Sequence, residues 1–150
     1  MDEIKIKVVC DESKRADIEQ RLKGGGFLIC DEAELVLSEA VLSTVTTRNV
    51  NGERVIVKID DIEYFESFGH DIFLITIEKE RFKIAEKMYE LEASLPSGFI
   101  RIGQSNIVHK KRIKKIIPSL FQRFDLLMES GVKLTVTRGY YYRFREALGI

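Results

Sequence analysis

The stretch that decides the fold of this chain lies in its second half and reads Phe99-Ile-Arg-Ile-Gly-Gln-Ser-Asn-Ile-Val-His109. A basic run, Lys110-Lys-Arg-Ile-Lys-Lys115, follows it, and Thr137-Arg-Gly-Tyr-Tyr-Tyr142 lies near the C-terminus. Residues 99–150 contain eleven Lys and Arg against three Asp and Glu, a net charge of +8, whereas residues 1–98 carry −8. Such asymmetry favours a nucleic acid or an acidic membrane surface as the partner of the basic half. The alternative is a solvated surface on which charges of one sign cluster.

Composition bounds the class of protein. With 45% hydrophobic and 32% charged residues among 150, the chain has the composition of a soluble globular protein of one domain or two small ones. No apolar run approaches the ~18 residues of a membrane span, and the acidic N-terminus lacks the apolar core of a signal peptide. We therefore expect a cytoplasmic protein without membrane insertion.

Cysteine and histidine give no sign of a metal site. Cys10 and Cys30 lack metal-ligand spacing and each ends an apolar run, so buried free thiols are expected, with a disulfide as the alternative. The only histidines, His70 and His109, are too far apart in sequence to support a zinc site. We expect no metal and no cofactor.

Residues 1–45 are expected to form a small β-α-β-β unit. Three glycines, residues 24–26, follow a helical segment and lack the Lys-Ser/Thr of a phosphate-binding loop, so they are interpreted as a helix end and a turn. The expected elements are a strand at residues 4–10, a helix capped by Asp11 or Ser13 that runs through Arg21, and strands at 27–30 and 35–37.

Residues 46–150 are expected to form a second, mostly β domain. The boundary is placed near residues 43–50, although this Thr- and Val-rich segment could equally be a strand that pairs the two units. Pro118 is expected to interrupt the alternating segment 112–117. The expected strands are residues 54–59, 62–67, 72–77, 81–85, 99–102, 123–128 and 132–137, with short helices at 86–95 and 140–148.

The stretch from Phe99 to His109 resembles the LytTR family, the DNA-binding output domain of LytR/AlgR-type bacterial regulators, whose members tend to read Phe-Ile-Arg-Val-His-Arg-Ser-x-Leu-Val-Asn. A later family stretch, Leu-x-Val-Ser-Arg-x-Tyr-Tyr, appears here as Leu134-Thr-Val-Thr-Arg-Gly-Tyr-Tyr141. Upstream, Ile62-Glu-Tyr-Phe-Glu-Ser67 matches the strand before the family's first DNA-facing loop. The resemblance covers roughly residues 52–150. It implies an elongated, multi-stranded β fold that lays loops, and not a recognition helix, into successive major grooves.

Three loops would carry the DNA contacts that the resemblance implies, and here they contain Gly69-His70, Gly103-Gln104-Ser105 and Arg138. The chain departs from the family pattern twice: Gly103-Gln104 replaces His-Arg, and His109 replaces Asn. These departures affect which DNA sequence is bound and leave the class of partner unchanged.

The side-chain chemistry supports the same loops. Arg138 can bind guanine O6 and N7 bidentately, and Gln104 can bind adenine N6 and N7. Hydroxyl and ammonium groups nearby can bind phosphates, which fix register without reading sequence. The expected DNA-binding residues are therefore His70, Gln104, Ser105, Asn106, Lys110, Lys111, Arg138 and Tyr140.

For three aromatic or charged residues another role is open. Arg138 could pair with an acid, and His70 could be an ordinary exposed turn residue. Tyr141 shares a helical face with Phe144 and Leu148, so it is expected in the core.

We expect a transcriptional regulator that binds double-stranded DNA as a homodimer on two repeated half-sites. Residues 1–45 are too short for a receiver domain, whose acidic cluster and lysine cannot be assigned, so control by abundance, ligand or partner protein is favoured over a phosphorelay. The alternative is a protein-interaction module whose basic half docks an acidic partner or a membrane surface. No arrangement of carboxylates, Ser/His/Asp or metal ligands indicates an enzyme, a catalytic residue or a small-molecule substrate.

Overall fold

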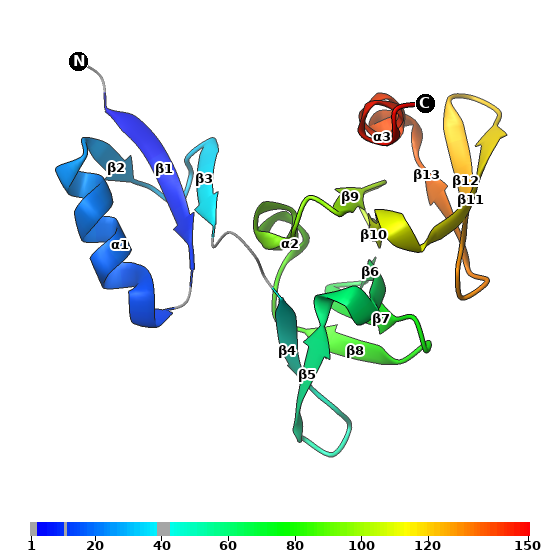
Figure 1. Ribbon diagram of the computed structural model, residues 1–150, viewed down its shortest axis with the longest axis horizontal. Coiled ribbons are helices and arrows are strands. Elements are labelled where there is room, and N and C mark those ends of the chain that lie inside the picture. The colour runs from blue at the N-terminus through cyan, green and yellow to red at the C-terminus, as the bar shows by residue number, and fades with distance from the viewer. Residues whose placement is uncertain (1–2, 11, 39–42) are drawn as a thin grey trace. The chain divides into compact units, whose positions relative to one another are not determined.

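The computed structural model describes residues 3–10, 12–38 and 43–150, and its contacts divide the chain into two compact units, Met1–Val41 and Leu42–Ile150 (Figure 1). The Thr- and Val-rich segment near the expected boundary forms β4 (Thr44–Arg48), which pairs antiparallel with β5 (Arg54–Lys58). Val45 is buried in the core of the second unit. This segment is therefore a strand of the second unit.

The first unit is the expected β-α-β-β arrangement. Its strands β1 (Ile4–Val9), β2 (Phe27–Ile29) and β3 (Leu35–Ser38) form a parallel sheet in the order β2-β1-β3, and α1 (Glu12–Gly24) connects β1 to β2. Ser13 lies inside α1 and so does not cap it, while Asp11, the other expected cap, lies outside the described residues.

Cys10 and Cys30 are free thiols, as expected, but they are half-exposed instead of buried. The expectation of burial was wrong because the helix beside them is highly charged and buries none of its residues, so the first unit has only a thin core around Ile6 and Val8.

The described residues of the second unit form three antiparallel sheets. The β4–β5 hairpin is one, and a five-stranded sheet in the order β8-β7-β6-β10-β9 is the next. Its strands are β6 (Ile62–Phe68), β7 (Asp71–Thr76), β8 (Arg81–Ile84), β9 (Phe99–Arg101) and β10 (Asn106–His109). The third sheet has the order β11-β12-β13 and consists of β11 (Ile113–Ser119), β12 (Arg123–Met128) and β13 (Lys133–Val136).

Helical segments in the second unit are short. Residues 43–150 form the α-helices α2 (Met88–Ser94) and α3 (Tyr141–Leu148) and the 3₁₀ turns η1 (Ile59–Asp61), η2 (Lys110–Arg112) and η3 (Arg138–Tyr140). The described residues therefore form a mostly β fold with few helices, as the sequence predicts.

Pro118 does not interrupt its strand. It pairs with Phe124 within the ladder between β11 and β12, and β11 continues to Ser119. A proline is tolerated here because β11 is an edge strand, where alternate backbone N–H groups face away from the neighbouring strand and a missing donor breaks no hydrogen bond. The expectation that Pro118 ends the segment was wrong for this reason.

Two apolar cores lie on opposite faces of the five-stranded sheet. Because side chains alternate along a strand, Phe65 and Ile107 pack toward the β4–β5 hairpin and α2, while Tyr64 and Val108 pack toward the third sheet and α3. Phe144 of α3 is fully buried in the second of these cores. The five-stranded sheet is thus the middle layer that fixes the other elements of the second unit.

His109, at the end of β10, is buried between these elements. Its Nδ1 lies 2.8 Å from the Ile62 carbonyl oxygen, and its ring stacks on Phe99 with centroids 4.2 Å apart. Burial is the main cause that lowers the pKa of His109; the Ile62 hydrogen bond opposes it, and the smaller effects of Lys111 and Arg112 lower the pKa while that of Asp60 raises it.

This depressed pKa makes stability pH-dependent. The unfolded chain takes up a proton at His109 near pH 6.5, whereas the folded chain does so only at lower pH, so the contribution is complete above pH 6.5 and is lost as pH falls below it. We predict that the free energy of unfolding, from urea titrations, falls more steeply below pH 6.5 in the wild type than in His109→Gln, which keeps a donor for the Ile62 carbonyl but carries no charge. Identical pH profiles would contradict this.

Candidate nucleic-acid interface

Backbone hydrogen bonds hold three turns at one end of the second unit. The Ser67 amide donates to the Ser105 carbonyl at 2.8 Å, which places the β6–β7 turn with His70 near the β9–β10 loop with Gln104. The Thr137 amide donates to the Ile102 carbonyl at 2.9 Å, which places Arg138 beside the same loop. The three turns that the family resemblance implicates therefore lie together, at what is called here the Arg138 end.

Most expected contact residues at the Arg138 end face solvent. His70, Gln104, Ser105 and Arg138 are all exposed. Within the described part of the chain, the Arg138 guanidinium has no acid and no hydrogen-bond acceptor as partner, so the alternative of a structural ion pair finds no support among these residues. The guanidinium group of Arg138 is therefore available to a ligand.

Asn106 and Tyr140, by contrast, are held within the protein. The Asn106 side-chain amide is half-buried and donates to the Phe65 carbonyl at 3.3 Å. The Tyr140 ring is half-buried, and the guanidinium carbons of Arg101 and Arg143 lie 5.8 and 5.2 Å from its centroid. Tyr141 stacks on Phe124 with centroids 4.9 Å apart and packs against the second core.

Arg101, which is not among the eight expected contact residues, holds the loop that carries Gln104. Its Nε donates to the Gly103 carbonyl at 2.9 Å and its Nη2 to the Gln104 carbonyl at 3.0 Å, while Nη1 pairs with Glu92 at 3.0 Å. One planar guanidinium thus fixes the backbone of the loop that presents Gln104. The position of Arg101 in the sequence could have indicated this role, because an arginine directly before a polar loop can donate hydrogen bonds to the carbonyls of that loop.

Close packing accompanies the departure from the family pattern at Gly103. This glycine is buried, and a Cβ atom on it would lie 3.3 Å from Thr137 Cγ2 and 3.4 Å from Thr137 Oγ1. A larger residue, such as the histidine common in the family, would require Thr137 to shift. Gly103 therefore permits a close approach of the β9–β10 loop to the segment that carries Arg138.

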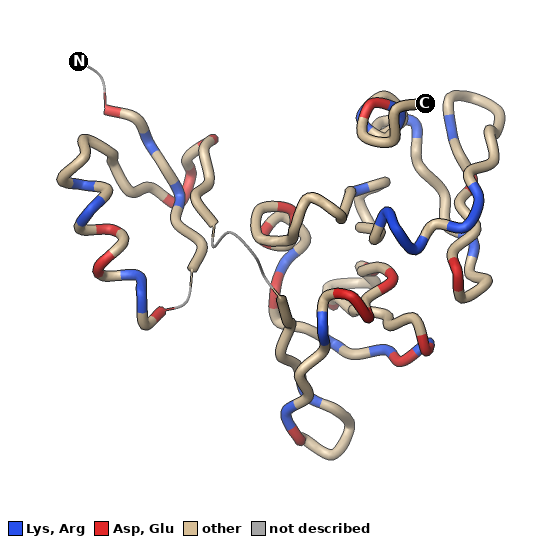
Figure 2. The backbone as a smooth tube through the Cα atoms, in the orientation of Figure 1, with Lys and Arg blue, Asp and Glu red and all other residues tan. Residues whose placement is uncertain are grey.

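The basic run lies at the other end of the five-stranded sheet. Since β10 runs antiparallel to β6, with Asn106 opposite Glu66 and Val108 opposite Tyr64, Lys110 and Lys111 lie near the start of β6. The eight expected contact residues are thus divided between the Arg138 end and this second location, called here the Lys111 end. Figure 2 shows the basic segment as it passes from η2 into β11.

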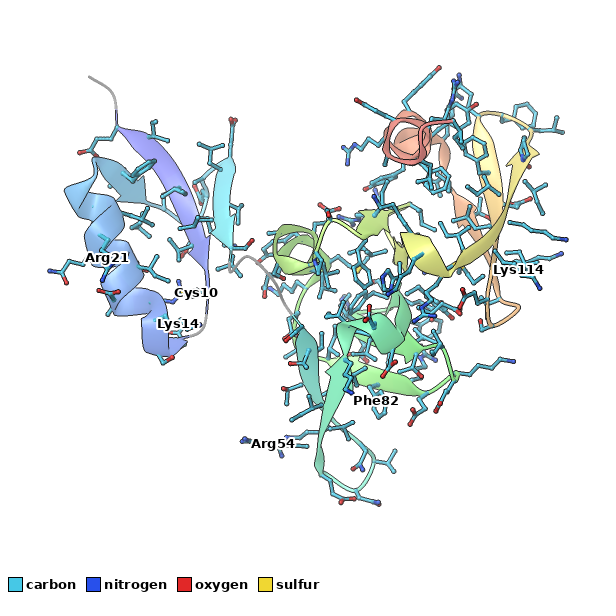
Figure 3. The ribbon with its side chains drawn as sticks, viewed as in Figure 1. Cys10, Lys14, Arg21, Arg54, Phe82 and Lys114 are labelled. Atoms are coloured by element: carbon cyan, nitrogen blue, oxygen red, sulfur yellow. The ribbon has the colours of Figure 1, made fainter. Side chains whose placement is uncertain are left out.

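Acids compensate part of the charge at the Lys111 end. Lys111 Nζ lies 2.5 Å from Asp60 Oδ1, and Arg112 Nη1 lies 3.1 Å from Glu129 Oε2. The hydrogen bond from Lys111 holds the pKa of the Asp60 carboxyl below its ordinary value. Lys114, in contrast, is exposed on β11 (Figure 3). The net charge of the sequence therefore overstates what the basic run offers to an anion.

A groove of about 880 Å³ lies between the β4–β5 hairpin and β8, where Figure 3 labels Arg54 and Phe82. None of the eight expected DNA-binding residues lines it. Among the described residues, none of the helices has the length and apolar composition needed to cross a membrane, and no cluster of three or more potential metal ligands occurs.

The fold and the three turns define a β-rich DNA-binding domain. The family model described as the LytTr DNA-binding domain matches residues 52–149, and the chain belongs to this family of DNA-binding transcriptional regulators. In the described part of the chain, strands separate the three α-helices from one another, so no two of them form a helix-turn-helix there.

Comparison with known proteins extends this assignment. An uncharacterized HTH-type transcriptional regulator of Staphylococcus aureus (strain NCTC 8325 / PS 47) is 35% identical over 101 residues, which cover 67% of this chain and 68% of that protein. The sensory transduction protein LytT of Enterococcus faecalis is 23% identical over 132 residues, which cover 81% of this chain and 54% of LytT. A solved LytTr DNA-binding domain from Bacillus cereus superposes with a TM-score of 0.69 at 29% identity, covering 73% of this chain and 99% of that one.

We predict that Arg101→Lys weakens DNA binding about tenfold without changing its salt dependence, because lysine keeps the charge but cannot bond both loop carbonyls. Arg145→Lys is the matched control, since Arg145 contacts only the C-terminal Ile150 carbonyl and the Tyr141 ring among the described residues. Titration of a fluorescent duplex at two salt concentrations measures both. Equal affinities for the two variants would rule out the loop-fixing role of Arg101.

Proposed function

We propose that this protein regulates transcription by binding duplex DNA sequence-specifically, with the turns at the Arg138 end in successive major grooves. The observation that carries the proposal is the pair of backbone hydrogen bonds that hold the three turns together, from the Ser67 amide to the Ser105 carbonyl and from the Thr137 amide to the Ile102 carbonyl. A preorganised set of turns loses little conformational entropy on docking, and base recognition requires such rigidity.

Arg138 and Gln104 are the proposed base readers. Arg138 begins η3 directly after β13, so its exposed side chain projects from a fixed backbone and can bind guanine O6 and N7. Gln104 is exposed, and its backbone carbonyl accepts a hydrogen bond from Arg101, which fixes the loop. Its side-chain amide can bind adenine N6 and N7. His70 and Ser105 flank these residues and can donate to phosphates or base edges.

Lys110 and Lys111 are proposed to contact phosphates, since an ammonium group is a point charge that reads no sequence. Asn106 and Tyr140 are proposed to position the interface, because the first bonds the Phe65 carbonyl and the second packs beneath two arginines. These roles divide the eight residues into readers, phosphate contacts and supports.

We further propose a cytoplasmic homodimer in which the first unit supplies dimerisation or regulation. Support comes from β3, an edge strand whose Leu35, Val36 and Leu37 are exposed by 54%, 42% and 39%. Parallel sheets are usually covered on both faces, so a partner surface is expected there. Residues 42–150 have their own two cores and supply all the proposed DNA contacts.

Substitutions at the two ends should have different effects. Arg138→Ala is expected to cost ~1–3 kcal/mol on the preferred duplex and to remove preference at one base pair. Lys111→Ala is expected to weaken all duplexes alike and to lower the log–log salt slope by at most about one, because Asp60 already neutralises part of its charge. Binding to matched and mismatched duplexes at two salt concentrations tests both. Salt-dependent binding with no discrimination in the wild type would instead favour the acidic-partner module.

We predict that a chain of residues 42–150 still folds and binds a single half-site, but loses dimerisation on a repeated site. Beginning at residue 42, and not 46, retains Val45 and Thr44 in β4, which pair with β5 and contribute to the first core. Sedimentation of both chains, with and without a two-site duplex, measures this. A well-folded 42–150 chain that binds no DNA would place essential contacts in the first unit.

A further inference from the structure

The turn between β11 and β12 exposes two large apolar side chains. Leu120 is 76% exposed and Phe121 is 77% exposed. Phe121 and Gln122 have φ angles of +60° and +56°, a left-handed backbone that L-residues adopt at a cost. The exposed side chains of this turn add nothing to the apolar core. Strained backbone and exposed apolar surface are both frequent at ligand-binding sites.

This turn lies at the Arg138 end. Pro118 pairs with Phe124 and Phe124 with Val136, so the β11–β12 turn and the residues after β13 lie at the same end of the third sheet (Figure 1). The Gln122 side-chain amide donates to the Tyr142 hydroxyl at 2.8 Å, which fixes the turn against the start of α3. Phe121 is therefore held next to the segment that presents Arg138.

The charges around the turn suit a polyanion. Arg123, Arg138 and Arg143 are exposed at this end of the sheet, and residues 119–123 contain no acid. Asp125, the nearest acid along β12, is half-buried and accepts from Thr135 Oγ1 at 3.2 Å. An apolar tip rimmed by arginines fits duplex DNA better than it fits an apolar protein surface.

We infer that Phe121 contacts the duplex beside the base pair bound by Arg138 and acts there as an apolar wedge. This inference rests on the proposed DNA-binding function and adds a non-ionic contact to it. Minor-groove proteins insert phenylalanine and leucine side chains between base steps, which unstacks them and bends the duplex, and we extend this action to a ring that lies beside a major-groove contact. The rigid left-handed turn keeps the ring from folding back onto the protein.

The test separates binding from folding. Phe121→Gly removes the ring and relieves the backbone strain, so the variant should have a higher Tm and yet bind the duplex about tenfold more weakly. Its salt slope should equal that of the wild type, since no charge is lost. Phe121→Trp should restore affinity, and energy transfer between dyes at the duplex ends should report less bending with Phe121→Gly than with the wild type.

Lys79→Gly is the matched control. Lys79 also has a left-handed backbone, at φ +69°, but it lies in the β7–β8 turn, where the Ile77 amide bonds the Asp61 carbonyl at the Lys111 end. It should gain stability in the same way and keep its affinity within about twofold.

These measurements distinguish a failure of the proposed DNA-binding function from a failure of the wedge role of Phe121. If the wild type binds no duplex with sequence preference, the proposed function fails and this inference fails with it. If the wild type binds and Phe121→Gly binds equally well, only the wedge is overturned. If Phe121→Gly changes the stoichiometry of self-association by sedimentation and leaves duplex affinity unchanged, the turn is a contact between copies and the wedge is likewise overturned.

Discussion

The hydrogen bond between the Thr137 amide and the Ile102 carbonyl is the constraint on which the interface depends. It joins the residue after β9 of the five-stranded sheet to the residue after β13 of the third sheet, and so sets Arg138 beside the loop that carries Gln104. Both partners are backbone groups, so the geometry does not depend on which side chains project from the loops. Residues 103–105 can therefore differ from the family pattern while the arrangement of turns persists.

The residues proposed to read the DNA sequence lie at the Arg138 end, away from the basic run of residues 110–115. At the Lys111 end, Asp60 and Glu129 pair with Lys111 and Arg112, and the buried Glu63 carboxylate accepts the Ser130 amide at 3.0 Å. These contacts hold the five-stranded sheet and the third sheet together at the Lys111 end and compensate part of its positive charge. At the Arg138 end, the exposed Arg138 lies in the short η3 turn between β13 and α3, and a side chain held on a fixed backbone is what sequence recognition requires.

Much of the fold follows from local sequence signals. Alternating apolar residues predict β6 and β12, and Glu129-Ser130-Gly131 predicts the hairpin that joins β12 to β13, where Gly131 has φ +92°. Pairings between distant segments could not be predicted in this way. The neighbours β6 and β10 are about forty residues apart, and Lys111 meets Asp60 across 51 positions, so only the closed structure divides the basic run from the three turns. The strand through Pro118 was missed because edge position is a property of the sheet and not of the sequence around the proline.

Mapping the amides that respond to DNA tests the central claim most directly. In a titration of the ¹⁵N-labelled chain with a preferred duplex, the largest chemical-shift changes should fall on Gly69 and His70, on residues 103–105, on Arg138 to Tyr140 and on the Leu120 to Gln122 turn. Residues of the β7–β8 turn should change little, and the amides of Lys110 and Lys111 should change less than those of the three turns because their side chains contact phosphates only. Changes centred on residues 110–115, with the three turns unaffected, would contradict the assignment of the interface to the Arg138 end.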